Sequence, residues 1–267
     1  FQNIAKAEGN LATIVGDAMA YQAGDHVALF DPETLSVTQD LKVVKASPAK
    51  WGKFEAQVLE LDGAPKVKNT LESMGRTEPF RLLFGHKGEL PVLIFNREFC
   101  HKGSVIRNNR FGNNRARGIL LRTSDTLIEH NTFYNLRGPA ILMASEGMWL
   151  ECGHIDNVTI KNNTFDRVSR SPILFSSIHY SSKRLPGEMS NRNLTISGNT
   201  FTDCGAPAIE GGDTFGLFGN LILLENVSNA TVSGNIFKPN SPLAPAAEKI
   251  IVNYSQKVTV DDNQEIK

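Results

Sequence analysis

The chain lacks the features that mark several large classes of protein. Its 28 basic and 28 acidic residues leave a formal net charge of zero, so no excess of positive charge favours nucleic acid or an anionic membrane as a partner. No apolar run approaches the roughly 20 residues that a membrane-spanning helix needs. No zinc-type Cys/His cluster, phosphate-binding glycine loop or Gly-x-Ser-x-Gly motif is present. The sequence therefore predicts neither a metal site nor a cofactor.

Cysteine is also scarce, with only Cys100, Cys152 and Cys204 in 267 residues. Three cysteines cannot all pair within one chain. Either all three are buried free thiols, which we favour, or one bridge leaves a single thiol free. The chain begins with Phe1, and neither a charged segment nor an apolar stretch of the signal-peptide kind follows. We therefore interpret Phe1 as a processed or truncated start.

What the sequence does contain is a repeat of the form Val158-Thr-Ile-Lys-Asn-Asn-Thr-Phe165. Each copy has a β-branched run, an Asn and, two residues later, a Phe. The copies place Asn at 109, 131, 163, 199 and 235, and Phe at 111, 133, 165, 201 and 237. A repeat of this length indicates a solenoid whose stacked units share one core. We predict an all-β, right-handed parallel β-helix of about six coils, with Asn side chains bonded from coil to coil and Phe rings stacked inside.

A second apolar run follows the Phe at a constant offset. Eight residues after four of the Phe residues stand Ile119, Ile141, Ile173 and Ile209. We read these as the start of a second strand in each coil, so the remaining length falls in the segments 144–157, 176–192 and 211–229. A fixed register predicts that these segments leave the same edge of three consecutive coils and line one cleft, the usual place for function on a solenoid.

The first hundred residues lack the repeat. The segments 23–30, 41–46 and 54–61 alternate apolar and polar residues at period two and end in turn residues. We predict a small antiparallel β-barrel or sandwich over 23–96, preceded by a leading segment or partial coil over 1–22 and followed by the β-helix over 97–267.

The expected cleft concentrates carboxylates beside an aromatic side chain, which suits the recognition and cleavage of sugars. A carboxyl pair can supply acid and base, and an aromatic face can stack on a pyranose. Each residue also has a structural alternative: a tryptophan roofing the coils, solvated loop glutamates, or surface arginines. The candidates are Glu146 and Glu151 for catalysis, and Trp149, Arg115, Arg117, His179 and Asp213 for substrate binding.

Two other functions remain open on residues alone. A β-helix polysaccharide lyase needs an acidic polymer, usually Ca²⁺, and a base such as Tyr180, Lys183 or Arg184. A non-catalytic glycan-binding or structural β-helix would lack a carboxyl pair within about 10 Å. A hydrolase is distinguished from both by a saturated product formed without Ca²⁺.

Two less common motifs, Arg115-Ala-Arg-Gly118 and Trp149-x-Glu-x-Gly153, stand on either side of the repeat copy ending at Phe133. Together with the copy ending at Phe165, they make the chain similar to glycoside hydrolase family 110. The resemblance implies a β-helix that carries a β-barrel insert. It also implies metal-independent, inverting hydrolysis of terminal α-1,3-linked galactose from oligo- or polysaccharides. The location that it implies is secreted, periplasmic or on the surface of a bacterium.

The chain departs from that family at two points. Where the resemblance implies a Gly-Asp-Ala-Asn-like stretch, Ser145-Glu-Gly-Met148 stands instead, so that Glu146 takes the place of a substrate-contacting Asp or that contact is lost. The family's chains are also much longer, and their catalytic aspartates are expected in coils ahead of the barrel. The resemblance therefore implies the C-terminal part of a catalytic β-helix with its barrel insert. If Phe1 is a truncated start, residues upstream of it complete the site.

Overall fold

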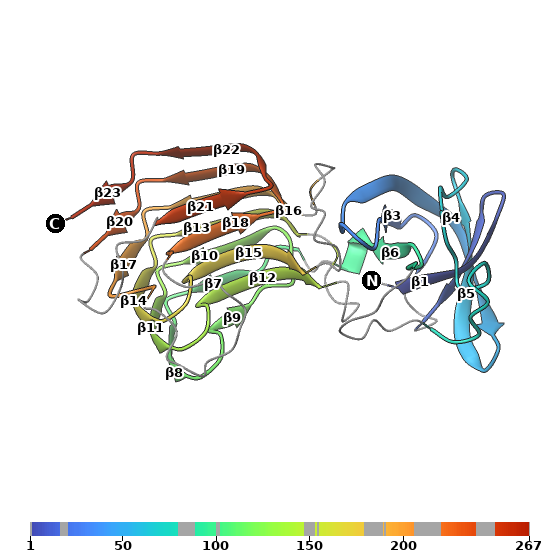
Figure 1. The fold of residues 1–267 in the computed structure, drawn as a ribbon, viewed down its shortest axis with the longest axis horizontal. Helices are drawn as coiled ribbons and strands as arrows, with labels where there is room; N and C mark the ends of the chain where they lie inside the picture. The colour runs from blue at the N-terminus through green and yellow to red at the C-terminus, as the bar shows by residue number, and fades with distance from the viewer. Residues whose placement is uncertain are drawn as a thin grey trace. The chain divides into compact units, whose positions relative to one another are not determined.

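The computed structural model describes residues 2–16, 21–79, 89–99, 102–146, 153, 155–178, 189, 191–205, 220–238 and 249–266. These form two compact units, the first chiefly Phe1–Cys100 and the second His101–Ala144, Ile155–Ser176 and Asn191–Lys267 (Figure 1). Apart from one 3₁₀ turn, η1 (Arg97–Phe99), all regular structure in these ranges is β-strand, which confirms the all-β prediction. In the same ranges, no helix has the length and apolar character to cross a membrane.

The first unit is a closed antiparallel barrel with the strand order β1-β2-β5-β4-β3-β6. Its strands are β1 (Gln2–Glu8), β2 (Leu11–Val15), β3 (His26–Phe30), β4 (Val37–Trp51), β5 (Phe54–Leu61) and β6 (Leu93–Asn96). The barrel closes where β1 pairs with β6, through Gln2 opposite Ile94 and Asn3 opposite Leu93. The prediction that 1–22 is a leading segment or partial coil is therefore wrong. The hairpin of β1 and β2 turns at Gly9, and without it the barrel would have two open edges.

Alternating residues of the barrel strands fill its interior. Ile4, Val27, Leu59 and Ile94 are fully buried in one apolar cluster. This alternation is the period-two pattern that predicted the strands. Tyr21 packs into the same cluster, and its burial, reinforced by the nearby Asp25 carboxylate, raises the pKa of the phenol.

The second unit is a parallel β-helix of six coils, each contributing one strand to each of up to three sheets (Figure 1). The first sheet comprises β7 (Val105–Arg107), β10 (Thr126–Glu129), β13 (Ile155–Lys161), β16 (Asn191–Ser197), β19 (Val227–Ser233) and β22 (Gln256–Asp261). The second comprises β8 (Arg110–Asn114), β11 (Thr132–Leu136), β14 (Thr164–Val168), β17 (Thr200–Thr202), β20 (Ile236–Phe237) and β23 (Gln264–Glu265). The third comprises β9 (Ile119–Leu120), β12 (Ile141–Glu146), β15 (Ile173–Ile178), β18 (Ile222–Glu225) and β21 (Ile250–Asn253).

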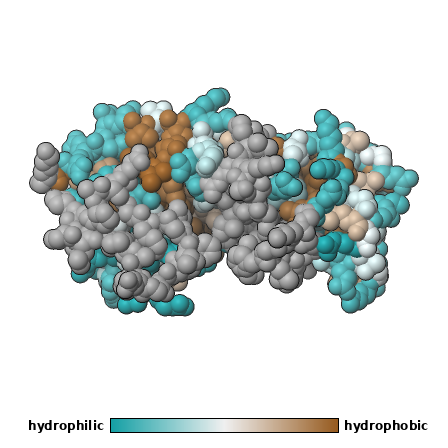
Figure 2. Space-filling model, in the orientation of Figure 1, coloured by the Kyte–Doolittle hydropathy of each residue, from teal (hydrophilic) through white to brown (hydrophobic). Residues whose placement is uncertain are grey.

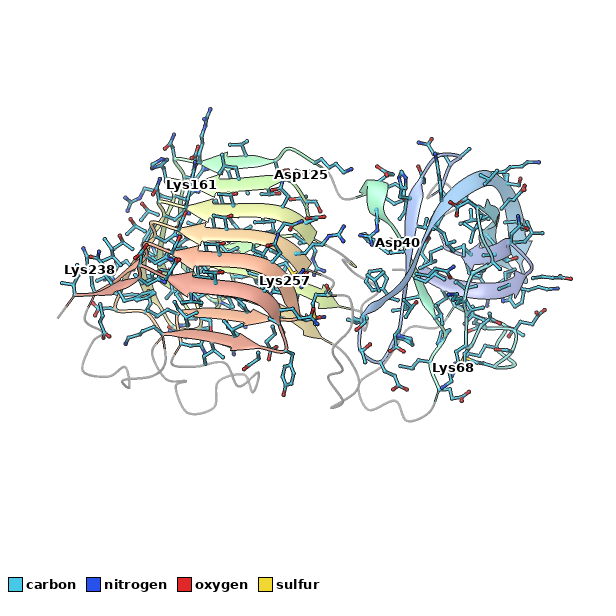
Figure 3. All side chains as sticks on the ribbon, turned by 90° about the horizontal axis from the view of Figure 1, so that it is seen from above. Asp40, Lys68, Asp125, Lys161, Lys238 and Lys257 are labelled. Carbon is cyan, nitrogen blue, oxygen red and sulfur yellow. The ribbon has the colours of Figure 1, made fainter. Side chains whose placement is uncertain are left out.

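The coils turn at three corners, which we number along the chain. The first corner joins the first sheet to the second, the second corner joins the second to the third, and the third corner leads back to the first sheet in the next coil. Figure 3 shows Asp125 and Lys257 at the third-corner end of the first sheet and Lys161 at its first-corner end. The same figure labels Asp40 and Lys68 in the barrel.

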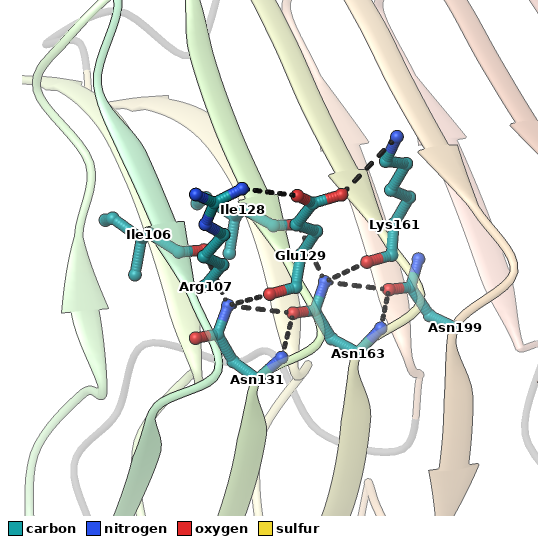
Figure 4. A network of polar contacts seen from close by, with 8 residues as sticks. All are labelled: Ile106, Arg107, Ile128, Glu129, Asn131, Lys161, Asn163 and Asn199. Carbon is teal, nitrogen blue, oxygen red and sulfur yellow. Dashed lines mark hydrogen bonds and ion pairs between the residues drawn. The ribbon is translucent and has the colours of Figure 1, made fainter.

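A ladder of Asn side chains joins the coils at the first corner (Figure 4). The Asn163 amide nitrogen donates to the Asn199 amide oxygen at 3.0 Å and to the Ile128 carbonyl at 2.9 Å. Its own oxygen accepts from the amide nitrogen of Asn131 at 3.0 Å and from the Asn131 backbone at 2.9 Å. Because these groups are buried, each bond satisfies a polar group that water cannot reach. The predicted coil-to-coil bonding of these Asn residues is confirmed.

The sharp turn of the first corner lies immediately before the ladder. A left-handed backbone is found at the residue that precedes each ladder Asn, and the ladder Asn itself has a negative φ. The left-handed residues are Asn108, His130, Asn162, Gly198, Gly234 and Asp262, with φ between 50° and 63°. Asn, Asp and Gly tolerate this conformation better than other residues. In an Asn-Asn pair, the first Asn therefore turns the backbone and the second bonds the neighbouring coils.

A stack of Phe rings fills the interior behind the ladder. Phe133, Phe165 and Phe201 are buried, with centroids 5.1 and 4.8 Å apart and ring planes within 11°. Phe111 extends the stack at 5.1 Å, and Phe237 ends it with a tilt of 42°. The spacing is that of neighbouring strands, about 4.8 Å, so the ring stack follows directly from parallel register. The predicted internal stacking is confirmed.

One carboxylate links three coils on the outer face of the first sheet (Figure 4). Glu129 lies between Arg107 and Lys161. One of its carboxylate oxygens is 4.0 Å from the Arg107 guanidinium, and the other is 3.4 Å from the Lys161 ammonium. Its side chain is 13% exposed, whereas those of the two cations are 64% and 40% exposed. The flanking charges offset the cost of shielding Glu129 from water, although exposed partners keep the net stabilisation small.

Cys204 is the one cysteine within the described ranges, and it is a buried free thiol. Its sulfur donates to the Thr202 carbonyl at 3.2 Å. Burial raises the pKa of this thiol to about 12, an effect that two backbone hydrogen bonds partly oppose. The prediction of a buried free thiol is confirmed for Cys204, and Cys100 and Cys152 lie outside the described residues.

We expect Cys204 to resist a thiol reagent at pH 8 in the native protein, because only the thiolate reacts and burial disfavours it. The measurement is the colour released from Ellman's reagent by a C100S/C152S variant, with and without denaturant. Above the ordinary pKa of a thiol, Cys204 ionises in the unfolded chain but stays protonated in the native protein. The contribution of Cys204 to stability is therefore complete below about pH 8.5 and falls as the pH rises toward 12.

A C204A variant of the same background is the control for the pH effect. Its unfolding midpoint in urea should decline less between pH 8 and pH 10 than that of the C100S/C152S protein. Equal declines, or a full thiol signal before denaturation, would show that Cys204 is not shielded.

Candidate functional site at the third sheet

The three corners differ in how much chain they contain. Two residues separate the strands at every first corner, for example 130–131 and 162–163. Long connections occur only at the other corners: 203–221 and 238–249 at the second, and 147–154 and 179–190 at the third. Both of these corners border the third sheet. The positions that can vary without disturbing the stack are therefore gathered at the two ends of the third-sheet strands.

This arrangement corrects the prediction that three long segments leave a single edge. The third-sheet strand of the fourth coil begins at Ile222, which pairs with Ile173, and not at Ile209. The segment that contains Asp213 therefore lies at the second corner, whereas Glu151 and His179 belong to connections at the third. The constant offset of eight residues fails in this coil because the second corner is longer. The triplet Ile222-Leu-Leu224, which repeats Ile119-Leu-Leu121, was the available signal.

The outer face of the third sheet carries a ladder of apolar side chains. Because Ile173 and Phe175 are buried in the stack, the alternate residue Leu174 faces outward. The outward column reads Leu120, Leu142, Leu174, Leu223 and Ile251 from coil to coil. Figure 2 shows apolar atoms gathered where β18 and β21 lie. Leu174 and Leu223 are only 6% and 1% exposed, so the middle of this face is shielded from water.

One carboxylate of the described residues lies on this face. Glu225 ends β18, faces outward two residues beyond Leu223, and is 8% exposed. Its carboxylate accepts a 2.7 Å hydrogen bond from the hydroxyl of Ser176, which is 49 residues earlier in sequence but opposite it in the sheet. Sequence reasoning missed Glu225 because the incorrect register placed it in a loop.

The predicted site residues fall at two separate places. Glu146 is the last residue of β12, at the third corner. Arg115 and Arg117 are exposed at the second corner, between β8 and β9. A six-residue strand spans about 17 Å, so the two places lie at opposite ends of the third sheet. The side chain of Glu146 and the whole of Trp149, Glu151, His179 and Asp213 lie outside the described residues.

The described ranges contain no group of three His, Cys, Asp or Glu side chains close enough to hold a metal ion.

A family model described as right-handed β-helix region matches residues 99–264. The chain belongs to this family. The match coincides with the parallel unit and gives the hand of the coils, which confirms the predicted right-handed β-helix.

Several bacterial proteins named α-1,3-galactosidase resemble this β-helix protein. α-1,3-Galactosidase A of Bacteroides thetaiotaomicron is 38% identical over 98 residues, 36% of this chain and 16% of the relative. α-1,3-Galactosidase B of Akkermansia muciniphila is 36% identical over 124 residues, 43% of this chain and 16% of the relative. α-1,3-Galactosidase A of Bacteroides fragilis is 33% identical over 143 residues, which are 51% of this chain and 24% of the relative. The predicted resemblance is confirmed, and the chain spans less than a quarter of each relative's length.

Among solved structures, the tailspike protein gp49 of Pseudomonas phage LKA1 aligns with this chain. The alignment covers 95% of this chain and 41% of the tailspike chain. Its sequence identity is 9% and its TM-score 0.22, too low to bear on fold or function.

Proposed function

We propose that this chain is part of a glycoside hydrolase that releases terminal α-1,3-linked galactose from glycans with inversion at the anomeric carbon. The observation that carries the proposal is the similarity to several α-1,3-galactosidases at 33–38% identity over 98–143 residues. Because those relatives are bacterial, we also propose a bacterial protein that acts outside the cytoplasm, where such glycans are found.

The reaction would take place on the outer face of the third sheet. Long connections border this face at both ends, and their side chains can vary without disturbing the stacked coils. The catalytic pair would be Glu146, at the end of β12, and Glu151, in the connection that follows. Trp149 would stack on the galactose ring, and His179 would bind its hydroxyls from the neighbouring third-corner connection. Asp213, in a connection at the second corner, would bind a more distant part of the glycan.

Inversion sets the chemistry of the pair. One carboxylate takes a proton from water as the water oxygen bonds to the anomeric carbon. The other, protonated, group gives its proton to the departing glycosidic oxygen as that bond breaks. The two groups need a separation of about 6.5–9.5 Å to admit the water. Equivalent positions on consecutive coils lie only about 4.8 Å apart, which is short of this range. An inverting pair must therefore be diagonal, two coils apart or, like Glu146 and Glu151, at one connection.

The experiment follows α-1,3-galactobiose by proton NMR in the presence of the chain and, in parallel, of the longest natural protein that contains it. We expect β-galactose to appear first and then to equilibrate with the α anomer. Initial release of α-galactose would contradict inversion. Absence of any galactose release by the longer protein would contradict the activity. An acidic polysaccharide is tested separately, because elimination requires a uronic acid that α-1,3-galactobiose lacks. An unsaturated product that forms from the acidic polymer only without EDTA would indicate a lyase instead.

A further inference from the structure

The Arg115-Ala-Arg-Gly118 motif forms a rigid turn at the second corner of the first coil. The Asn114 side chain closes it from both sides. Its oxygen accepts from the Ala116 backbone at 3.0 Å, and its nitrogen donates to the Arg117 carbonyl at 3.2 Å. The next coil is bonded to the same turn, because the Gly138 backbone donates to the Ala116 carbonyl at 3.1 Å. Both arginine side chains therefore start from a fixed backbone.

Two glycines let the coils approach closely here. A Cβ atom on Gly138 would lie 2.7 Å from the Ala116 carbonyl oxygen, and one on Gly118 would lie 2.7 Å from the Ala140 carbonyl oxygen. Real Cβ atoms do not approach backbone oxygens so closely, so any side chain would push the two coils apart. The glycines thus explain why the motif ends in Gly, but they do not explain its arginines.

Two arginines lie side by side on adjacent coils, although their like charges repel. The Arg137 backbone donates to the Asn114 carbonyl at 3.1 Å, which places Arg137 beside Arg115 on adjacent coils. Like charges directly opposite in neighbouring strands repel. Arg115, Arg117 and Arg137 are all exposed, and no carboxylate in the described ranges makes an ion pair with any of them. In a chain whose net charge is zero, this is a local concentration of unneutralised positive charge.

Arg167, in β14 of the third coil and two positions before the second corner, shows the contrasting arrangement. Its guanidinium lies 2.7 Å from the carboxylate of its neighbour Asp166 and donates to it a second time at 3.1 Å. An arginine close to the second corner can therefore be accompanied by its counter-ion. The first two coils carry arginines without one.

We propose that Arg115, Arg117 and Arg137 bind an anionic group, a sulfate ester or a carboxylate, carried by a glycan that lies on the third sheet. Guanidinium groups bind such oxyanions through paired, charge-assisted hydrogen bonds. The turn holds two of them on a fixed backbone, so binding costs little ordering. The identity of the carrier as a glycan rests on the proposed function, whereas the binding of the anion rests on the arginines alone.

The test compares three galactose-containing oligosaccharides of equal length by calorimetry in about 50 mM NaCl, where charge screening is weak. One is neutral, one carries sulfate esters, and one carries uronic acid carboxylates. We expect at least one charged probe to bind about tenfold or more tightly than the neutral one, an advantage lost at high salt. The R115Q/R137Q variant should bind that charged probe no more tightly than it binds the neutral one. R167Q, the matched control, should bind within about twofold of wild type.

Equal affinity for all three probes would overturn the inference, as would equal losses in R115Q/R137Q and R167Q. Which charged probe responds identifies the anion. Because the double variant removes a repulsive pair, its unfolding midpoint should be no lower than that of wild type, so that lost binding cannot be ascribed to misfolding. Charged probes that bind while α-1,3-galactobiose is never hydrolysed would refute the proposed activity and leave the anion site standing.

Discussion

Replacing Glu151 with Gln is expected to lower the turnover of α-1,3-galactobiose by about 10²–10⁴-fold, the usual contribution of a general acid or base. The amide keeps the shape of the side chain but can neither take nor give the proton. Glu146→Gln should produce a loss of the same order, because in the proposed mechanism both carboxyls act on one transition state. The measurement is the initial rate of galactose release at saturating substrate, with the circular dichroism spectrum recorded for each variant.

A second substrate separates the two roles. An aryl α-galactoside has a leaving group that needs little protonation, so the variant lacking the acid should lose much less activity on it than on the disaccharide. The variant lacking the base should lose activity equally on both. Glu129→Gln is the control, since Glu129 is on the first sheet, with Arg107 and Lys161, and its loss should leave turnover unchanged. If the Glu151 and Glu146 variants both retain more than about a third of wild-type turnover, the catalytic assignment is wrong.

Asn163→Ala is expected to destabilise the β-helix by about 3–5 kcal/mol, the largest effect on stability that we predict. The side chain is 1% exposed and joins three coils. Its removal leaves the Ile128 carbonyl and the Asn131 backbone N–H without the partner that the Asn163 side chain gives them in the native ladder. The Asn131 amide nitrogen loses one of three acceptors and keeps the Ile106 and Glu129 carbonyls. Each buried polar group deprived of its bond costs about 1–3 kcal/mol. Urea unfolding followed by circular dichroism measures the loss.

Asn109→Ala is the matched control at the first coil of the same ladder. Asn109 is exposed, and its side chain donates to the Arg107 carbonyl at 2.9 Å and to Asn131 at 3.3 Å. Water can replace these bonds, so the expected loss is below about 1 kcal/mol. Comparable losses at 109 and 163 would mean that the ladder adds no more stability inside the stack than at its end.

The fold of the β-helix could be predicted from sequence because its determinants are local and repeated. Each Phe and each ladder Asn lies opposite its own copy, so a single pattern specifies four stacked Phe pairs and five bonded Asn pairs. The barrel was harder, because β1 and β2 find their partners far along the chain. Nothing in residues 2–15 alone records that Gln2 will pair with Ile94.

The candidate site could be predicted only in part, for a related reason. The repeat determines which residues stack, but it is silent about the length of a corner. One extended corner displaced the apparent start of a strand from Ile222 to Ile209. This error put the segment of Asp213 at the third corner instead of the second, and it put Glu225 in a connection instead of a strand. The arginine motif was recognised correctly as distinctive. Its charge repulsion became visible only when the backbone bonds put Arg137 beside Arg115.

The two-residue first corner has a consequence for how such a protein can diversify. Because the Asn ladder and the Phe stack lock each coil to its neighbours there, the other two corners are free to accept insertions without altering any strand pairing. Thr202 and Ile222 are separated by a long connection and Asn114 and Ile119 by a short one, yet Ile222 and Ile119 both continue the same column. The first corner is thus the fixed spine of the molecule. Evolution or design can therefore change the specificity of the protein by exchanging whole connections at the two ends of the third sheet.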